Sequence, residues 1–244
     1  NLQKPKTNFP DEQVFIMYHQ ITELYFKLIL LEITQIGNKK DAIDKKFFIE
    51  RLTRINRYFE NLIRSFDIMI QGMEKEQFLH FRMTLLPASG FQSGQYRLIE
   101  ITSTDFINLV DKDVKNSFSE KSTIEEMYEK IYWKKGSIEL STGKKTLTLQ
   151  EFEEKYSELF IKSGKDYRDK NLWAVYSKLP LPDQKNEEVI ASLKKYDTNV
   201  NVNWPLVHYK SAVRYLQQKS EVIAATGGTN WQKYLPPHFQ KRVF

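Results

Sequence analysis

The sequence predicts an all-α fold, a bundle of helices, and three observations carry this prediction. Two long stretches, residues 10–36 and 41–72, repeat apolar side chains at three- and four-residue steps, the period of a helix. Shorter stretches with the same period occupy residues 92–110, 122–135, 149–163, 184–197 and 204–224. Strand-like patterning is confined to residues 137–149, where a small hairpin is predicted.

The first helix is predicted to begin after Pro10 and to end before residues 37–38. Asp11 and Glu12 suit its first turn, because negative charge is favoured at the positive end of the helix dipole. A Gly-Asn pair at residues 37–38 is typical of a helix end. The second helix, residues 41–72, is expected to pack antiparallel to the first.

Length and composition indicate one domain over residues 1–244, with 41% hydrophobic residues. The chain contains no run of about 18 apolar residues and no apolar leader at its start, so we expect no membrane span and a cytoplasmic location. Because the first residue is Asn rather than Met, we also expect that an N-terminal segment of the full protein is missing.

The absence of cysteine excludes disulfides and thiolate ligands and leaves four histidines as the natural metal ligands. The net charge of +6 comes from 37 basic and 31 acidic residues that are dispersed along the chain. We interpret this charge as a solubility feature and expect no nucleic-acid partner.

Rare polar groups stand among apolar residues in two segments. His19 lies one helical turn after Phe15, and Arg82 follows Phe78 by four residues, so each pair shares one helix face. A guanidinium among apolar neighbours is costly to bury unless it meets an anion, and a substrate carboxylate would supply one. The alternatives are an internal ion pair of Arg82 with Glu23 or Glu32 and a carbonyl-bonded core histidine for His19.

His208 occurs in a third such segment, four residues after Trp204, on a helix face apolar enough to shield a flat cofactor. A satisfied core histidine is the alternative. Two glycine-containing stretches, around Ser89 and Gly90 and after Thr226, allow close backbone approach, yet as bare patterns they indicate only loops.

The order and spacing of these residues resemble the haem-dependent tryptophan 2,3-dioxygenase family. The resemblance runs from about residue 11 to residue 229 and is specific in three places, residues 11–27, 78–97 and 204–228. Residues 112–195 match only in helical character. Ala225 departs from the glycine common in the family, and the interval from His208 to Thr226 is about one helical turn longer than is typical of it.

For the cofactor, the resemblance implies heme b, with His208 as the ligand of its iron. Trp204 would belong to the haem wall, and Ser89 and Gly90 would contact the haem from their loop.

For the substrate, the resemblance implies that Arg82 and Thr226 bind the amino-acid end. His19 would act as the catalytic histidine by accepting a hydrogen bond from the indole N–H, while Phe15 and Phe78 position the ring.

The implied reaction inserts O2 across the indole C2–C3 bond of L-tryptophan to give N-formylkynurenine. The resemblance also implies a homotetramer, in which an upstream segment completes a neighbouring subunit's pocket. Two alternatives stay open: a haem enzyme that acts on another indole or aromatic amine, and a non-catalytic haem-binding helical protein.

Overall fold

The structure is a computed structural model that describes residues 3–85, 93–119, 121–137 and 145–217. Helices form its regular structure, and the described ranges contain no strand longer than an isolated bridge residue, such as the bridge between Val110 and Ile131. The all-α prediction is therefore confirmed.

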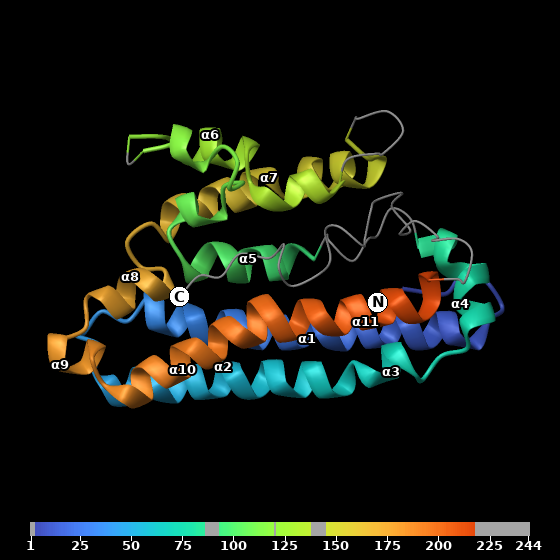
Figure 1. The fold of residues 1–244 in the computed structure, drawn as a ribbon, viewed down its shortest axis with the longest axis horizontal. Helices are drawn as coiled ribbons and strands as arrows, with labels where there is room; N and C mark the ends of the chain where they lie inside the picture. The colour runs from blue at the N-terminus through green and yellow to red at the C-terminus, as the bar shows by residue number, and fades with distance from the viewer. Residues whose placement is uncertain (1–2, 86–92, 120, 138–144, 218–244) are drawn as a thin grey trace.

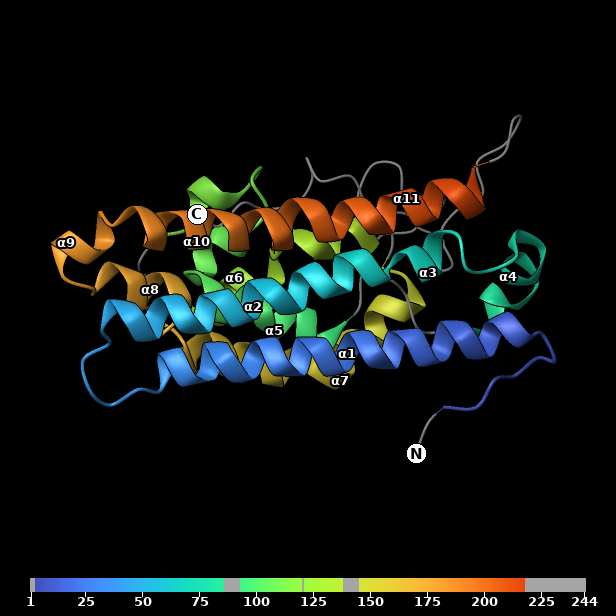
Figure 2. The ribbon, with the colours of Figure 1, turned by 90° about the horizontal axis from the view of Figure 1, so that it is seen from below.

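Three long helical rods run side by side along the length of the molecule, and the third consists of two helices joined end to end through a π-helical joint, η5 (Figures 1 and 2). The second rod packs on both of the others. Their apolar faces, together with α3 (Asp67–Ile70), form the larger hydrophobic core. These elements are α1 (Pro10–Gly37), α2 (Lys45–Ser65), α10 (Glu187–Thr198), η5 (Asn199–Asn203) and α11 (Trp204–Leu216).

A second layer covers one side of this bundle (Figure 1). α5 (Gly94–Ser103) packs on α1 and on α7 (Leu147–Asp166), and α7 packs in turn on α6 (Ile124–Glu129). This layer contains a second apolar cluster centred on aromatic residues. Its short 3₁₀ helices are η2 (Phe106–Leu109), η3 (Lys115–Ser117) and η4 (Tyr132–Ser137).

Short helices occupy the two ends of the bundle (Figures 1 and 2). α8 (Leu172–Ser177) and α9 (Leu181–Gln184) lie at one end, where the chain returns from α7 to α10. α4 (Lys75–Phe81) and the 3₁₀ helix η1 (Arg82–Leu85) lie at the other, beside the start of α1 and near α11. Because the sequence segments singled out above contain α1, α4, η1 and α11, they meet at this second end.

The prediction of one continuous helix over residues 41–72 is wrong at both its start and its middle. Asp44 caps the observed helix by accepting a hydrogen bond from the Phe47 N–H at 2.7 Å, so α2 begins at Lys45. The helix breaks at Phe66, between α2 and α3. The Phe66 ring packs against both Trp204 and His208, and this tertiary contact accompanies the break.

The predicted hairpin is wrong over residues 147–149 of its second strand, although the Thr146 N–H donates to the Ser137 carbonyl at 3.1 Å and so joins the two ends of the predicted hairpin. Residues 147–149 begin helix α7, whereas residues 138–144 lie outside the described ranges. The Thr146 hydroxyl accepts a hydrogen bond from the Leu149 N–H at 3.2 Å, so the threonine that suggested a strand is a helix cap.

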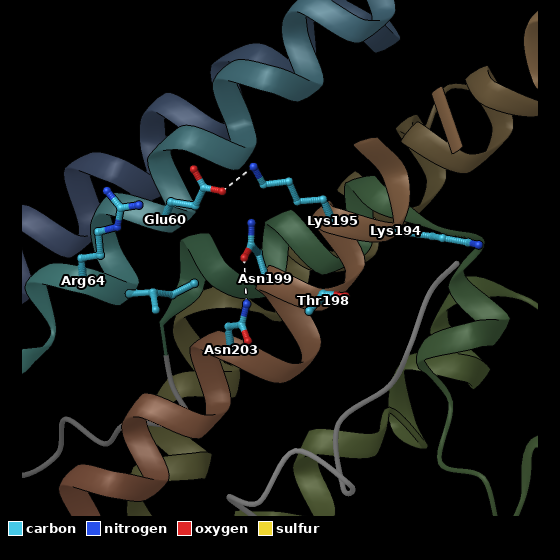
Figure 3. A pocket seen from close by; sticks show the side chains of 8 residues that line it. Glu60, Arg64, Lys194, Lys195, Thr198, Asn199 and Asn203 are labelled. Atoms are coloured by element: carbon cyan, nitrogen blue, oxygen red, sulfur yellow. Dashed lines mark hydrogen bonds and ion pairs between the residues drawn. The ribbon is translucent and has the colours of Figure 1, made fainter. Parts of the chain in front are cut away.

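The joint η5 borders a polar hollow between α2 and α10 (Figure 3). Lys195 Nζ lies 2.5 Å from a Glu60 carboxylate oxygen, and Lys194 points away from these groups. The Asn203 amide donates to Asn199 Oδ1 at 3.0 Å. Because polar groups here bind one another across the joint, we assign them a structural role.

Among the helices of the described ranges, α1 alone is long and apolar enough to span a membrane. Its buried residues pack against α2 and α5, so we interpret it as a core helix of the bundle. Its outer face nevertheless exposes a stripe of apolar side chains at alternating steps of four and three residues. The stripe consists of Met17, Ile21, Leu24, Leu28 and Leu31.

Candidate active site

The two candidate histidines have the same hydrogen-bonding arrangement on different helices. His19 Nδ1 lies 2.8 Å from the Phe15 carbonyl on α1, and His208 Nδ1 lies 3.0 Å from the Trp204 carbonyl on α11. A carbonyl oxygen can only accept, so each Nδ1 carries the hydrogen. The unprotonated Nε2 of each neutral ring therefore keeps its lone pair for a metal ion or a donor.

Aromatic rings wall the space around His208. Its ring centroid lies 4.3 Å from that of Phe66 and 4.4 Å from that of Trp204. Phe66 also contacts Tyr18, the neighbour of His19, at 5.7 Å. Phe66 thus links the wall of one histidine to the helix that carries the other.

A second chain of ring contacts connects the two helices through α4. Phe15 stacks on His19 with a centroid separation of 4.0 Å and lies 6.1 Å from Phe78. Phe78 in turn lies 4.7 Å from Tyr215 on α11. The predicted residues Phe15, His19 and Phe78 are therefore in one contiguous cluster.

Burial keeps both histidines neutral near neutral pH. It lowers the pKa of His208 to about 4, although the bond to the Trp204 carbonyl opposes this and the nearby His19 adds to it. Burial also lowers the pKa of His19, against the raising effects of its carbonyl bond and of the Glu23 carboxylate. Metal binding requires a neutral imidazole, so this electrostatic state suits a ligand.

Arg82 is buried, with 6% of its surface exposed, in the 3₁₀ turn that follows α4. Burial lowers the pKa of its guanidinium, because a charged group is disfavoured away from water. The two carboxylates considered as internal partners of Arg82 have other hydrogen-bond partners of their own. Glu23 accepts from Ser93 and Gln95, and Glu32 pairs with arginines of α2.

The carboxylates of α1 are contributors that the sequence analysis did not single out as binding groups. Glu12, 1% exposed, accepts a hydrogen bond from the Thr84 hydroxyl at 3.0 Å. Glu23 accepts from Ser93 Oγ at 2.5 Å and from Gln95 Nε2 at 2.7 Å. Their position in the sequence could have identified them, because both acids lie on the helix face that carries His19.

Three predicted site residues lie outside the described ranges. Ser89 and Gly90 belong to residues 86–92, and Thr226 belongs to residues 218–244. Their expected roles in cofactor and substrate binding therefore stay predictions.

Fold and site together define an all-α protein in which two neutral imidazoles lie within a cluster of aromatic side chains. The chain belongs to the tryptophan 2,3-dioxygenase family, whose family model matches residues 1–226.

Individual members of the family match a shorter part of the chain. The tryptophan 2,3-dioxygenase of Ruegeria sp. (strain TM1040) is 38% identical over 95 residues, which cover 39% of this chain and 34% of the relative. That of Bacillus thuringiensis (strain Al Hakam) is 38% identical over 100 residues, 40% of this chain and 35% of the relative. That of Sorangium cellulosum (strain So ce56) is 41% identical over 96 residues, which cover 37% of this chain and 23% of the relative. In these comparisons the chain spans about a third or less of each relative's length.

A histidine titration tests the electrostatics of the site. We expect the cofactor-free protein to show one imidazole that titrates at about pH 4 in carbon-13 histidine NMR spectra, and the resonance should vanish in His208→Gln. Since the folded pKa lies below the ordinary value of 6.5, the unfolded chain binds the proton more readily, and His208 should reduce stability as pH falls from about 6.5 towards 4. A resonance that titrates near 6.5 would contradict the burial of this ring.

Proposed function

We propose that the chain is a haem dioxygenase domain, residues 1–244, that converts L-tryptophan and O2 to N-formylkynurenine in the cytoplasm. Family membership supports the reaction class. The observation that carries the proposal is the paired arrangement of His19 and His208, each with Nδ1 bonded to a carbonyl and Nε2 left as an acceptor.

The residues fit a haem group. His208 would hold the haem iron through its neutral Nε2, and the hydrogen bond from its Nδ1–H to the Trp204 carbonyl fixes the orientation of the ring. The proposed holders are His208 as iron ligand, Trp204 in the wall, and Ser89 and Gly90 against the macrocycle. When bound, the haem iron supplies the one-electron chemistry that activates O2.

The chain's own residues would act by positioning the substrate. His19 Nε2 accepts the indole N–H, and Phe15 and Phe78 pack against the ring, as their contacts with one another allow. Arg82 binds the substrate carboxylate, a charge-assisted pairing that also opposes the effect of burial on the guanidinium. Thr226 contacts the amino-acid end.

The net reaction needs no group from the protein to be consumed. The indole C2–C3 bond breaks, each carbon gains one oxygen atom of O2, and no external electrons enter the balance. Holding the indole in one orientation and excluding water are therefore the tasks left to the side chains.

We also propose that the protein is a homotetramer and that the apolar stripe on α1, from Met17 to Leu31, packs against a second copy. Leu24 is 63% and Leu31 54% exposed. Alternating steps of four and three residues are the spacing with which two helices interdigitate. An exposed apolar stripe on so long a helix suits a helix of another subunit.

Reconstitution with hemin tests the proposed cofactor and reaction. We expect the reduced wild-type protein to give a CO-bound haem spectrum and to form N-formylkynurenine from L-tryptophan. His208→Ala should abolish stable haem incorporation, whereas His19→Ala should keep haem and change turnover. Haem binding without turnover in the wild type would favour the non-catalytic alternative, and a reversed pattern in the variants would exchange the two histidine roles.

Arg82→Ala should raise the KM for tryptophan far more than it changes haem content. A hydrogen bond to a charged group contributes about 1.5–3 kcal/mol, so we expect an increase of roughly 10- to 150-fold in KM. Steady-state kinetics and the haem absorbance of the same preparation measure the two quantities. An unchanged KM would remove Arg82 from the carboxylate site.

The subunit interface can be tested by charge. Leu24→Glu and Leu31→Glu should shift the protein to smaller assemblies, because each places a carboxylate in the proposed apolar contact. Leu181→Glu on α9 is the matched control, since this leucine is 67% exposed and lies off the stripe. Sedimentation velocity reports the assembly state. The same mass for wild type and both stripe variants would exclude α1 as the interface.

A further inference from the structure

We infer that Glu12 is a positioning residue that holds the turn bearing Arg82 at a fixed place relative to Phe15 and His19. The inference rests on the proposed function, because it assigns to Arg82 the binding of the substrate carboxylate. Glu12 does not touch substrate in this proposal and acts through Thr84.

The Glu12 carboxylate accepts hydrogen bonds from two segments of the chain, the residues before α1 and the turn η1. On one side the N–H groups of Lys6 and Thr7 donate to it at 2.9 and 2.7 Å, and the Thr7 hydroxyl donates at 2.5 Å. On the other side the Thr84 hydroxyl lies 3.0 Å from it, and this hydroxyl shares its one hydrogen with the Phe81 carbonyl at 2.7 Å. Lys6 Nζ completes the arrangement by donating to the Thr84 carbonyl at 2.9 Å. We call these four residues, Lys6, Thr7, Glu12 and Thr84, the Glu12 clasp.

The Glu12 clasp connects directly to the candidate site through two rigid elements. Thr84 and Arg82 belong to the same 3₁₀ turn, η1. Glu12 precedes Phe15 by three residues and His19 by seven, so all three share one face of α1. The clasp therefore sets the separation between the cation and the groups that would hold the indole.

The neighbouring acid, Asp11, holds the other end of the same segment. Its carboxylate accepts from the Glu74 N–H at 2.7 Å, at the start of α4, and its own N–H donates to Gln77 Oε1 at 3.2 Å. Residues 74–84, which contain Phe78 and Arg82, are thus bound to the start of α1 at both ends. Loss of the Thr84 hydroxyl therefore loosens the end of this segment that contains Arg82 and leaves the bonds of Asp11 at the other end in place.

Glu12 is suited to this task because it stays ionised. Burial raises the pKa of its carboxyl group, yet the hydrogen bonds from Lys6, Thr7 and Thr84 together lower the pKa below its ordinary value. An ionised carboxylate offers acceptors to all of these donors, which neither a protonated acid nor an amide can do.

The test compares two ligands that differ in the group that Arg82 would bind. L-Tryptophan carries a carboxylate, and tryptamine has the same indole and amine without it. In the haem-loaded full chain we expect Thr84→Val to weaken L-tryptophan binding about tenfold and tryptamine binding less than twofold, with kcat for tryptophan nearly unchanged. Glu12→Gln should act in the same direction, and Thr84→Ser, which restores the hydroxyl, should restore binding.

Two controls separate positioning from a general loss of structure. Thr102→Val removes another buried hydroxyl, bonded to the Leu98 carbonyl on α5, and should leave the preference for tryptophan intact. Amide hydrogen exchange over residues 78–85 should accelerate in Thr84→Val and stay at the wild-type rate in Thr102→Val. Unchanged exchange in Thr84→Val would overturn the inference.

The remaining outcomes distinguish the inference from the function beneath it. If Arg82→Ala loses the preference for tryptophan and Thr84→Val keeps it, Glu12 is not a positioning residue and the carboxylate site stands. If the wild type does not prefer tryptophan to tryptamine, the proposed carboxylate site fails, and the inference fails with it.

Discussion

The candidate site depends on hydrogen bonds between carboxylates of α1 and the segment that follows α3. Glu12 binds Thr84, and Glu23 binds Ser93 and Gln95, so the two ends of the intervening stretch are tied to one helix. A carboxylate that accepts several donors is strongly held, and buried ones tolerate little displacement. The groups on α1 and those on α4 and η1 are consequently parts of one framework, although they are about 60 residues apart in sequence.

Backbone hydrogen bonds and burial together determine the protonation state of the two histidines. Each histidine uses a backbone carbonyl one turn earlier on its own helix, so no second side chain is needed to fix its tautomer. Aromatic neighbours exclude water without adding charge, and burial then favours the neutral imidazole. The buried guanidinium of Arg82 adds a positive group to the region, and the proposed function assigns the substrate carboxylate to it.

Helix periodicity was sufficient for the helical class and for α1, whose predicted and observed limits agree within a residue or two. It also placed Phe15 with His19 and Trp204 with His208 on shared faces, because those pairs are one turn apart. Helix periodicity cannot predict contacts between segments that are distant in the sequence. The pattern made Phe66 one more core residue of a long helix, and its contact with His208 depends on the tertiary structure. Thr146 had strand-like neighbours, and only the folded chain shows its hydroxyl at a helix start. Glu12 could be explained by the helix dipole alone, which concealed its bond to Thr84.

The π-helical joint between α10 and α11 has a consequence for insertions and deletions. A π turn accommodates an additional residue, and each residue of an α-helix rotates the following side chains by about 100°. Removing a single residue from Asn199–Asn203 would make residues from α10 to α11 one uniform α-helix. The His208 side chain would then rotate about the helix axis, away from Phe66. The number of residues in the joint Asn199–Asn203 therefore sets the direction in which α11 presents the His208 imidazole.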